Sequence, residues 1–226
     1  KMGIMDPTLN LFIIGGIFAY IRMITFQDRP YFYAVLSSIC LAIAFLIKGP
    51  IAIIIPALVF IMYFSFYNKS QLNLRHNLFF ILLLCIFSMS WYLVESFRNG
   101  FWFIEQFIIY QFKLVSTADA DHKGFFLFHF LVFILLCFPA STFFITGIKN
   151  NWKADDFSKI MALLFTIVIV IFFIVKTKIV HYSSLVYIPG CYFSALAIHD
   201  FTTKKRVLLS KVEWSLLTCS LSIYLI

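Results

Sequence analysis

The chain has 226 residues, of which 62% are hydrophobic and 12% are charged, and its formal net charge is +8. Repeated apolar runs of about 17–20 residues exclude a soluble globular domain and predict membrane-spanning helices. The positive charge does not indicate nucleic-acid binding. The basic residues are scattered between apolar runs, where they fit anionic lipid and phosphate instead.

The order of apolar runs predicts an all-α integral membrane protein, because the runs are continuous rather than alternating. Some runs are short for a hydrocarbon core of about 30 Å, so we expect tilted helices or a locally thin bilayer. We expect one transmembrane domain over 1–226. The chain starts without Met and ends within an apolar run, so we expect the first spans and first external loop upstream of Lys1. The eight predicted spans are 9–25, 31–47, 51–67, 78–94, 126–148, 159–175, 183–199 and 212–226.

The lysine and arginine residues predict the orientation of these spans. If residues 1–6 lie outside, most of the basic residues fall in the inner connections, as the positive-inside rule requires. The basic residues left on the outer side lie mostly close to the ends of spans. A simple connecting loop would not need them there, which indicates a binding role on the outer side.

Two polar positions accompany the first three spans. Asp6, followed by Pro7 and Thr8, predicts a helix start. Its carboxylate serves either as a cap or as an acidic group that holds a sugar hydroxyl, a metal ion or a cationic partner. Lys48 precedes Gly49-Pro50, which splits a long apolar stretch into two spans. Lys48 either extends its side chain to the membrane interface or contacts phosphate on the outer face.

Residues 95–125 form the one long connection, which we predict to be an external loop with an amphipathic helix over 101–115. Long ordered loops often carry binding residues. Glu95, Arg98 and His122 are the candidates here. No second ligand stands at a recognisable spacing from His122, so we predict no metal site. The five cysteines lack paired spacing and are interpreted as small core residues.

The segment Lys176-Thr177-Lys178-Ile179-Val180-His181-Tyr182 lies where one predicted span ends and the next begins. Charges against hydrocarbon cost several kcal/mol unless they face water, a partner or an anion, so they usually mark a site. We interpret this turn as the site that holds the phosphate of a lipid-linked substrate. The alternative is that Lys176 and Lys178 only extend to the membrane interface.

The same segment, followed by Tyr187-Ile188-Pro189, resembles the "K-T-K-x-x-H-Y…Y-x-P" segment of bacterial membrane glycosyltransferases. These are the aminoarabinose (lipid A) transferases and their relatives of the protein O-mannosyltransferase family, which have the GT-C fold. Other stretches agree in order, although Gly124 stands where proline is common in the last. They are Met5-Asp6, Leu46-Ile47-Lys48-Gly49-Pro50-Ile51, Trp91-Tyr92…Arg98-Asn99-Gly100 and Asp121-His122-Lys123-Gly124-Phe125-Phe126.

The resemblance implies transfer of a sugar from a polyprenyl-phosphate donor to an acceptor, which is lipid A, a protein or another glycan. The reaction would take place on the outer face of the bacterial inner membrane. Separately, we predict no required cofactor, and no residue pattern supports a divalent metal. The expected partners are the donor, the acceptor and membrane lipids. The family's catalytic aspartate lies on the first external loop, which we expect upstream of Lys1. Asp6 is then the candidate catalytic carboxylate within the chain.

The chemistry of a phosphate leaving group selects the candidate residues. Negative charge collects on the phosphate oxygens in the transition state, and cations at the membrane boundary would stabilise it. Glu95 and His122 are predicted to contact substrate in the loop, and no metal ligand is predicted. The predicted donor-phosphate contacts are Lys176, Lys178, His181, Arg98 and Lys48, with Tyr182 as a hydrogen-bond donor.

Two other functions fit the same residues. A transporter or flippase would bind the phosphate and break no bond, and such proteins often contain broken helices with polar groups at mid-membrane. A lipid-carrier glycan ligase or polymerase would also carry basic residues on the outer face. The polar residues here gather at the outer boundary beside one long loop, which favours the transferase.

Overall fold

The computed structural model describes residues 5–25, 29–67, 73–116, 127–174 and 180–203, together with residues 214, 215, 218 and 222. Every regular element in these segments is helical, which confirms the predicted all-α class. The chain divides into two compact units, Lys1–Ala120 and Asp121–Ile226. Each unit is described by itself below.

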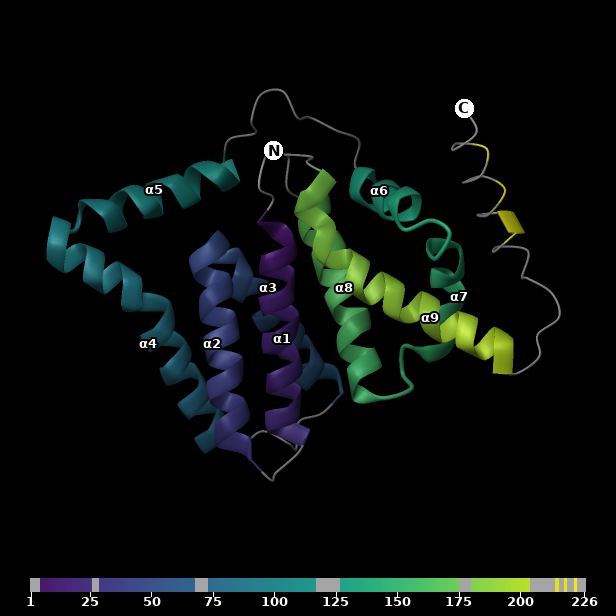
Figure 1. Cartoon of the computed structure of the whole chain (residues 1–226), viewed down its shortest axis with the longest axis horizontal. Coiled ribbons are helices and arrows are strands. Elements are labelled where there is room, and N and C mark those ends of the chain that lie inside the picture. Colours follow the sequence, from purple (N-terminus) through teal and green to yellow (C-terminus); the bar gives the residue numbers. More distant parts are fainter. Residues whose placement is uncertain are drawn as a thin grey trace. The chain divides into compact units, whose positions relative to one another are not determined.

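The described residues of the first unit form five helices, which are labelled in Figure 1. The predicted helix start at Asp6 is confirmed, and the aspartate stands in the first turn, where a negative charge stabilises the helix dipole. Pro30 occupies the first turn of the next helix, where its missing N–H is not needed. The helices are α1 (Asp6–Thr25), α2 (Pro30–Lys48), α3 (Ile51–Phe66), α4 (Leu74–Asn99) and α5 (Trp102–Ser116).

Small residues let α1, α2 and α4 approach closely, as is common between membrane helices. A Cβ atom at Gly16 would lie 2.6 Å from the Leu41 side chain, so a larger residue there would force Leu41 of α2 to move. The Ser37 hydroxyl donates to the Gly16 carbonyl at 2.8 Å, and Ser38 donates to the Phe80 carbonyl of α4 at 3.0 Å. These bonds join the three helices where apolar surroundings offer no water.

The described part of the second unit starts with two short helices that meet at an angle of 107°. The bend occupies 137–140 and includes Pro139, which cannot donate a backbone hydrogen bond. Hydroxyl groups bond the carbonyls around the bend: Ser141 donates to Ile134 at 2.6 Å and Thr142 donates to Pro139 at 2.7 Å. The elements are α6 (Phe128–Leu136), α7 (Ser141–Asn151), α8 (Asp156–Ile174), the 3₁₀ segment η1 (Val180–Val186) and α9 (Tyr187–Thr203).

The core of the second unit is packed closely between α6, α7, α8 and α9. A Cβ atom at Gly147 would lie 1.9 Å from the Phe193 carbonyl oxygen, and one at Gly190 would lie 2.2 Å from the Phe133 ring. Both glycines therefore allow packing that no larger residue permits. Phe133 is 1% exposed and packs edge to face on Phe144 and Phe165, with ring centroids 5.1 and 5.3 Å apart.

The chain is a multi-pass membrane protein, but eight spans are not confirmed. Among the described residues, α1, α2, α4 and α8 are long and apolar enough to cross a membrane, and the bent α6–α7 pair would be a fifth span. The predicted single span 126–148 is corrected to that bent pair, because the chain turns at Pro139. The predicted spans 51–67 and 183–199 correspond to shorter helices of 16 and 17 residues. The span 212–226 lies almost wholly outside the described residues.

The structure also corrects the predictions for the loop 95–125 and for the cysteines. The predicted loop 95–125 is helical over much of its length, since α4 continues to Asn99 and α5 follows almost at once. The expected helix at 101–115 is present as α5. The four cysteines that the structure describes form no disulfide, but none is fully buried as the core interpretation expected: Cys40 and Cys137 are half-buried, and Cys85 and Cys191 are exposed.

Candidate functional site

The first polar cluster joins the beginning of α1 to the end of α2. Lys48 donates from its ammonium group to Oδ1 of Asp6, and the two form an ion pair. The side chain of Asp6 is 10% exposed and that of Lys48 is 31% exposed. Asp6 lies in the first turn of its helix and Lys48 in the last turn of its helix, so each charge also interacts favourably with a helix dipole. The carboxylate of Asp6 therefore stands at the start of α1 and pairs with a cation of the same unit.

Gly49 follows Lys48 and allows α5 to lie against this turn. Its φ is +75°, a backbone conformation that residues other than glycine rarely adopt. Its N–H donates to the Phe45 carbonyl at 2.7 Å and so caps the end of α2. A Cβ atom at Gly49 would lie 2.8 Å from Nε2 of Gln111 and 3.4 Å from the Phe107 ring. The Gln111 amide and the Phe107 ring of α5 are therefore next to the Lys48–Gly49 turn.

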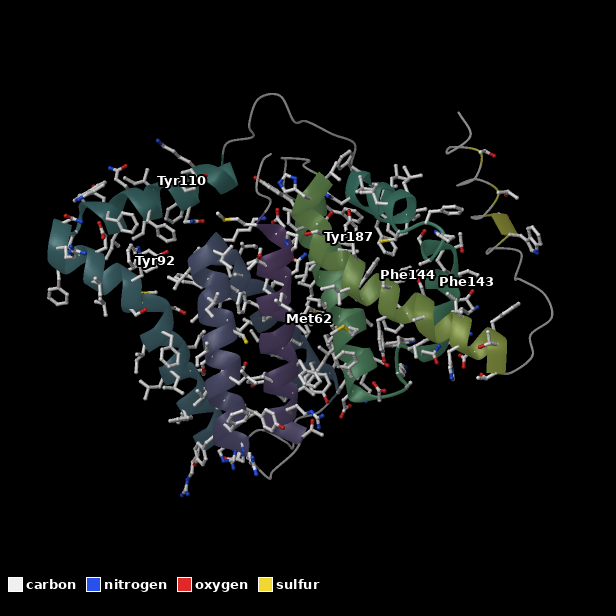
Figure 2. The ribbon with its side chains drawn as sticks, viewed as in Figure 1. Met62, Tyr92, Tyr110, Phe143, Phe144 and Tyr187 are labelled. Atoms are coloured by element: carbon white, nitrogen blue, oxygen red, sulfur yellow. The ribbon has the colours of Figure 1, made fainter. Side chains whose placement is uncertain are left out.

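Aromatic packing holds α5 in that position. Tyr92 of α4, labelled in Figure 2, is 8% exposed. Its ring lies 5.8 Å from the Phe45 ring of α2, 5.0 Å from Phe107 and 6.0 Å from Phe103, all between centroids. One tyrosine thus joins α2, α4 and α5. Ring pairs at these separations stabilise packing beyond their buried area.

Glu95 and Arg98 stand on the last turns of α4, which ends at Asn99. Oε1 of Glu95 accepts a hydrogen bond from the Asn99 amide at 2.6 Å. Arg98 is exposed and makes no hydrogen bond or ion pair within the part of the chain that the structure describes. The structure thus brings Asp6 and Lys48 together, and it leaves the guanidinium of Arg98 on the surface.

The second polar cluster lies in the second unit, around η1. His181 and Tyr182 are half-buried, and their rings meet at 84° with centroids 5.2 Å apart. Tyr182 also lies 6.4 Å from the Phe172 ring of α8. The other candidates from the predicted turn at 176–182 are Lys176 and Lys178, which lie outside the described residues. His122 also lies outside them.

His129 of α6 is a residue that the sequence reasoning missed. It is 0% exposed, and its Nδ1 lies 2.9 Å from the Ser183 hydroxyl, directly after Tyr182. The His129 ring also contacts Phe172, with centroids 5.2 Å apart. A histidine inside an apolar run was the available signal, since polar residues within membrane segments usually have a specific partner. His129 therefore fixes η1, and with it the backbone that carries His181 and Tyr182.

No group of histidine, cysteine, aspartate and glutamate side chains suited to a metal ion occurs among the described residues. The candidates divide between the units: Asp6, Lys48, Glu95 and Arg98 belong to the first, and His181 and Tyr182 belong to the second. The first unit offers a compensated ion pair beside an amide and an aromatic ring. The second offers an imidazole and a phenol at the end of a membrane helix.

Comparisons with known proteins bear on the fold. No protein-family model matches the chain, and no curated protein sequence matches it. Two solved structures of ArnT from Cupriavidus metallidurans do match, each with a TM-score of 0.67 over 97% of this chain. The structure bound to undecaprenyl phosphate is 18% identical to the chain, and the apo structure is 16% identical.

The matching region covers 40% of the ArnT chain in one structure and 39% in the other, so the chain spans about two fifths of the length of its neighbour. At such low sequence identity, the similarity is evidence for a shared fold. ArnT is an aminoarabinose (lipid A) transferase of GT-C type, so the resemblance noted from the sequence motifs is confirmed at the level of the fold. The described residues therefore have the helical arrangement of part of the GT-C protein ArnT.

Proposed function

We propose that the protein is a membrane glycosyltransferase that takes a sugar from a polyprenyl-phosphate donor. The acceptor would be lipid A, a protein or another glycan, on the outer face of the bacterial inner membrane. The observation that carries this proposal is the fold shared over nearly the whole chain with ArnT, one structure of which is bound to undecaprenyl phosphate.

The proposed donor-phosphate contacts are cations and hydrogen-bond donors at the ends of membrane helices. His181 and Tyr182 present an imidazole and a phenol on η1. Arg98 presents an exposed guanidinium, which can bind two phosphate oxygens at once. Lys176 and Lys178 belong to the same proposal, as do Glu95 and His122 for substrate contacts in the loop.

The chemistry follows from charge. Breaking the bond between the sugar and the phosphate leaves negative charge on the lipid phosphate, and fixed cations stabilise that charge more strongly in the transition state than before it. Lys48 is a weaker cation for this purpose, because Asp6 compensates its charge. Asp6 is the described carboxylate beside Lys48 and stays the candidate acid–base or orienting group.

The test is turnover of radiolabelled undecaprenyl-phosphate sugars by the complete protein in membranes. Removing a group that stabilises transition-state charge costs about 100-fold or more in rate, so His181→Ala and Lys178→Ala should each lower transfer by that order. The matched controls are His199→Ala and Lys149→Ala, which replace exposed residues of the same types in the second unit and should keep transfer within about twofold. Equal losses in the test and control variants would contradict the assigned roles.

A flippase for the same lipid is the second candidate, and the bend between α6 and α7 favours it. Broken helices often occur at the substrate sites of transporters. The turnover experiment separates the two functions. Movement of the labelled lipid across the bilayer with its sugar bond always intact would support the flippase and exclude the transferase.

A further inference from the structure

Two side chains of α5 have no part in the proposed phosphate contacts. Phe107 and Gln111 are one helical turn apart, so they share a face of α5, and both lie against the Lys48–Gly49 turn. Gln111 is half-buried, whereas Gln106 and Tyr110 on the same helix are exposed. The Gln111 amide makes no hydrogen bond to any residue in the segments that the structure describes. A half-buried amide has two donors and one acceptor to satisfy.

The groups at and beside the Lys48–Gly49 turn match a sugar better than they match a phosphate. The Asp6–Lys48 pair has no net charge, so it attracts a phosphate less than a lone lysine would. The same pair offers a carboxylate that accepts from a hydroxyl group and an ammonium that donates to one. Phe107 adds an aromatic ring, which can cover the apolar C–H face of a sugar. Small-molecule sites commonly combine aromatic walls with a few placed polar groups.

We propose that Gln111 is a specificity-determining residue that hydrogen-bonds the sugar of the lipid-linked donor above the Lys48–Gly49 turn, with Phe107 against the sugar ring. This inference rests on the proposed function and concerns the sugar rather than the phosphate of the donor. Gly49 is part of the arrangement, since any side chain there would displace the Gln111 amide. Tyr92 keeps α5 close enough for the contact.

The test compares two kinds of probe on the complete protein in lipid nanodiscs. One kind is undecaprenyl phosphate that carries mannose or aminoarabinose, and the other is undecaprenyl phosphate alone. Gln111→Met keeps the length of the side chain and removes its hydrogen bonds. We expect it to weaken binding of the sugar-carrying probe that the unchanged protein prefers by about tenfold. Binding of undecaprenyl phosphate alone should stay within about twofold, because the phosphate contacts are intact.

The matched control is Gln106→Met, an exposed glutamine on the same helix, which should change neither affinity. Gln111→Asn is the second variant and is used if the methionine variant does not fold; its shorter amide should cause the same selective loss. An equal loss for both kinds of probe, or no loss for either, would overturn the inference alone. Failure of the unchanged protein to bind either probe would overturn the proposed function and the inference with it.

Discussion

The two polar clusters are held by different forces. In the first unit, Asp6 and Lys48 carry opposite charges; Asp6 is nearly buried, and Lys48 remains partly accessible. In the second unit, His129 and Ser183 share a hydrogen bond of 2.9 Å that needs no charge, and both residues are buried. Separating a charge from water is costly, so an ion pair belongs near a boundary, whereas a neutral bond is stable in an apolar interior. The first cluster can therefore exchange partners with a ligand, and the second is suited to fixing the backbone.

The largest expected effect comes from His129→Ala. The change removes a buried ring that packs on Phe172 and leaves the Ser183 hydroxyl without its bond. We expect a loss of about 3 kcal/mol in the free energy of unfolding, from the cavity and the lost hydrogen bond together. Unfolding in mixed micelles with increasing SDS measures it.

Ser183→Ala is the control for that variant, because it removes the hydrogen bond and keeps the ring. We expect it to cost about 1 kcal/mol. Equal costs for the two variants would mean that the packing of the His129 ring contributes nothing, and the second cluster would then resemble the first in depending on polar contacts alone.

The sequence predicted most helices of the fold because hydropathy reports apolar runs directly. The polar ends of helices were missed for the same reason, because a helix can continue into polar residues. The predicted span 78–94, for example, is part of α4, which runs from Leu74 to Asn99. The bend between α6 and α7 was missed because apolar content does not change there. Pro139 was the local signal, and its effect depends on hydroxyl groups that bond the exposed carbonyls.

The candidate site was predictable only in part. The order of spans places Asp6 and Lys48 at the same end of neighbouring helices, but it does not show that they pair across 42 residues. The bond between His129 and Ser183 joins residues 54 apart and depends on how α6 packs against η1. The position of Gln111 depends on a glycine with positive φ and on the ring of Tyr92. Such contacts arise from tertiary packing, which hydropathy does not encode.

Gly49→Ala and Gly100→Ala test whether the side chains beside the Asp6–Lys48 pair can move. Both glycines have positive φ, +75° and +81°, so alanine should cost about 1–2 kcal/mol of unfolding free energy at each. Only at Gly49 would the new methyl group meet another residue, the movable end of Gln111. The stability losses should therefore be similar, while only Gly49→Ala should weaken binding of sugar-carrying undecaprenyl phosphate, by about fivefold.

Unfolding and donor binding are measured on the same two variants. A much greater stability loss for Gly49→Ala would show that Gln111 cannot move aside, and the first cluster would then be as rigid as the close contact at Gly147. Equal donor affinities for the two variants would show that the Gln111 amide does not contact the sugar.

The smallest expected effect is the coupling between Asp6 and Lys48. A double-mutant cycle with Asp6→Asn and Lys48→Met should give a coupling free energy of about 1 kcal/mol, since one partner is nearly buried and the other is partly exposed. If water reaches the pair, raising the salt concentration from about 0.05 M to about 0.5 M should reduce the coupling by half or more. The same cycle on His129→Ala and Ser183→Ala should give a coupling that does not depend on salt, because neither group needs a charge. A salt-independent Asp6–Lys48 coupling would mean that the pair is closed to solvent, and a pair closed to solvent could not take part in binding a sugar.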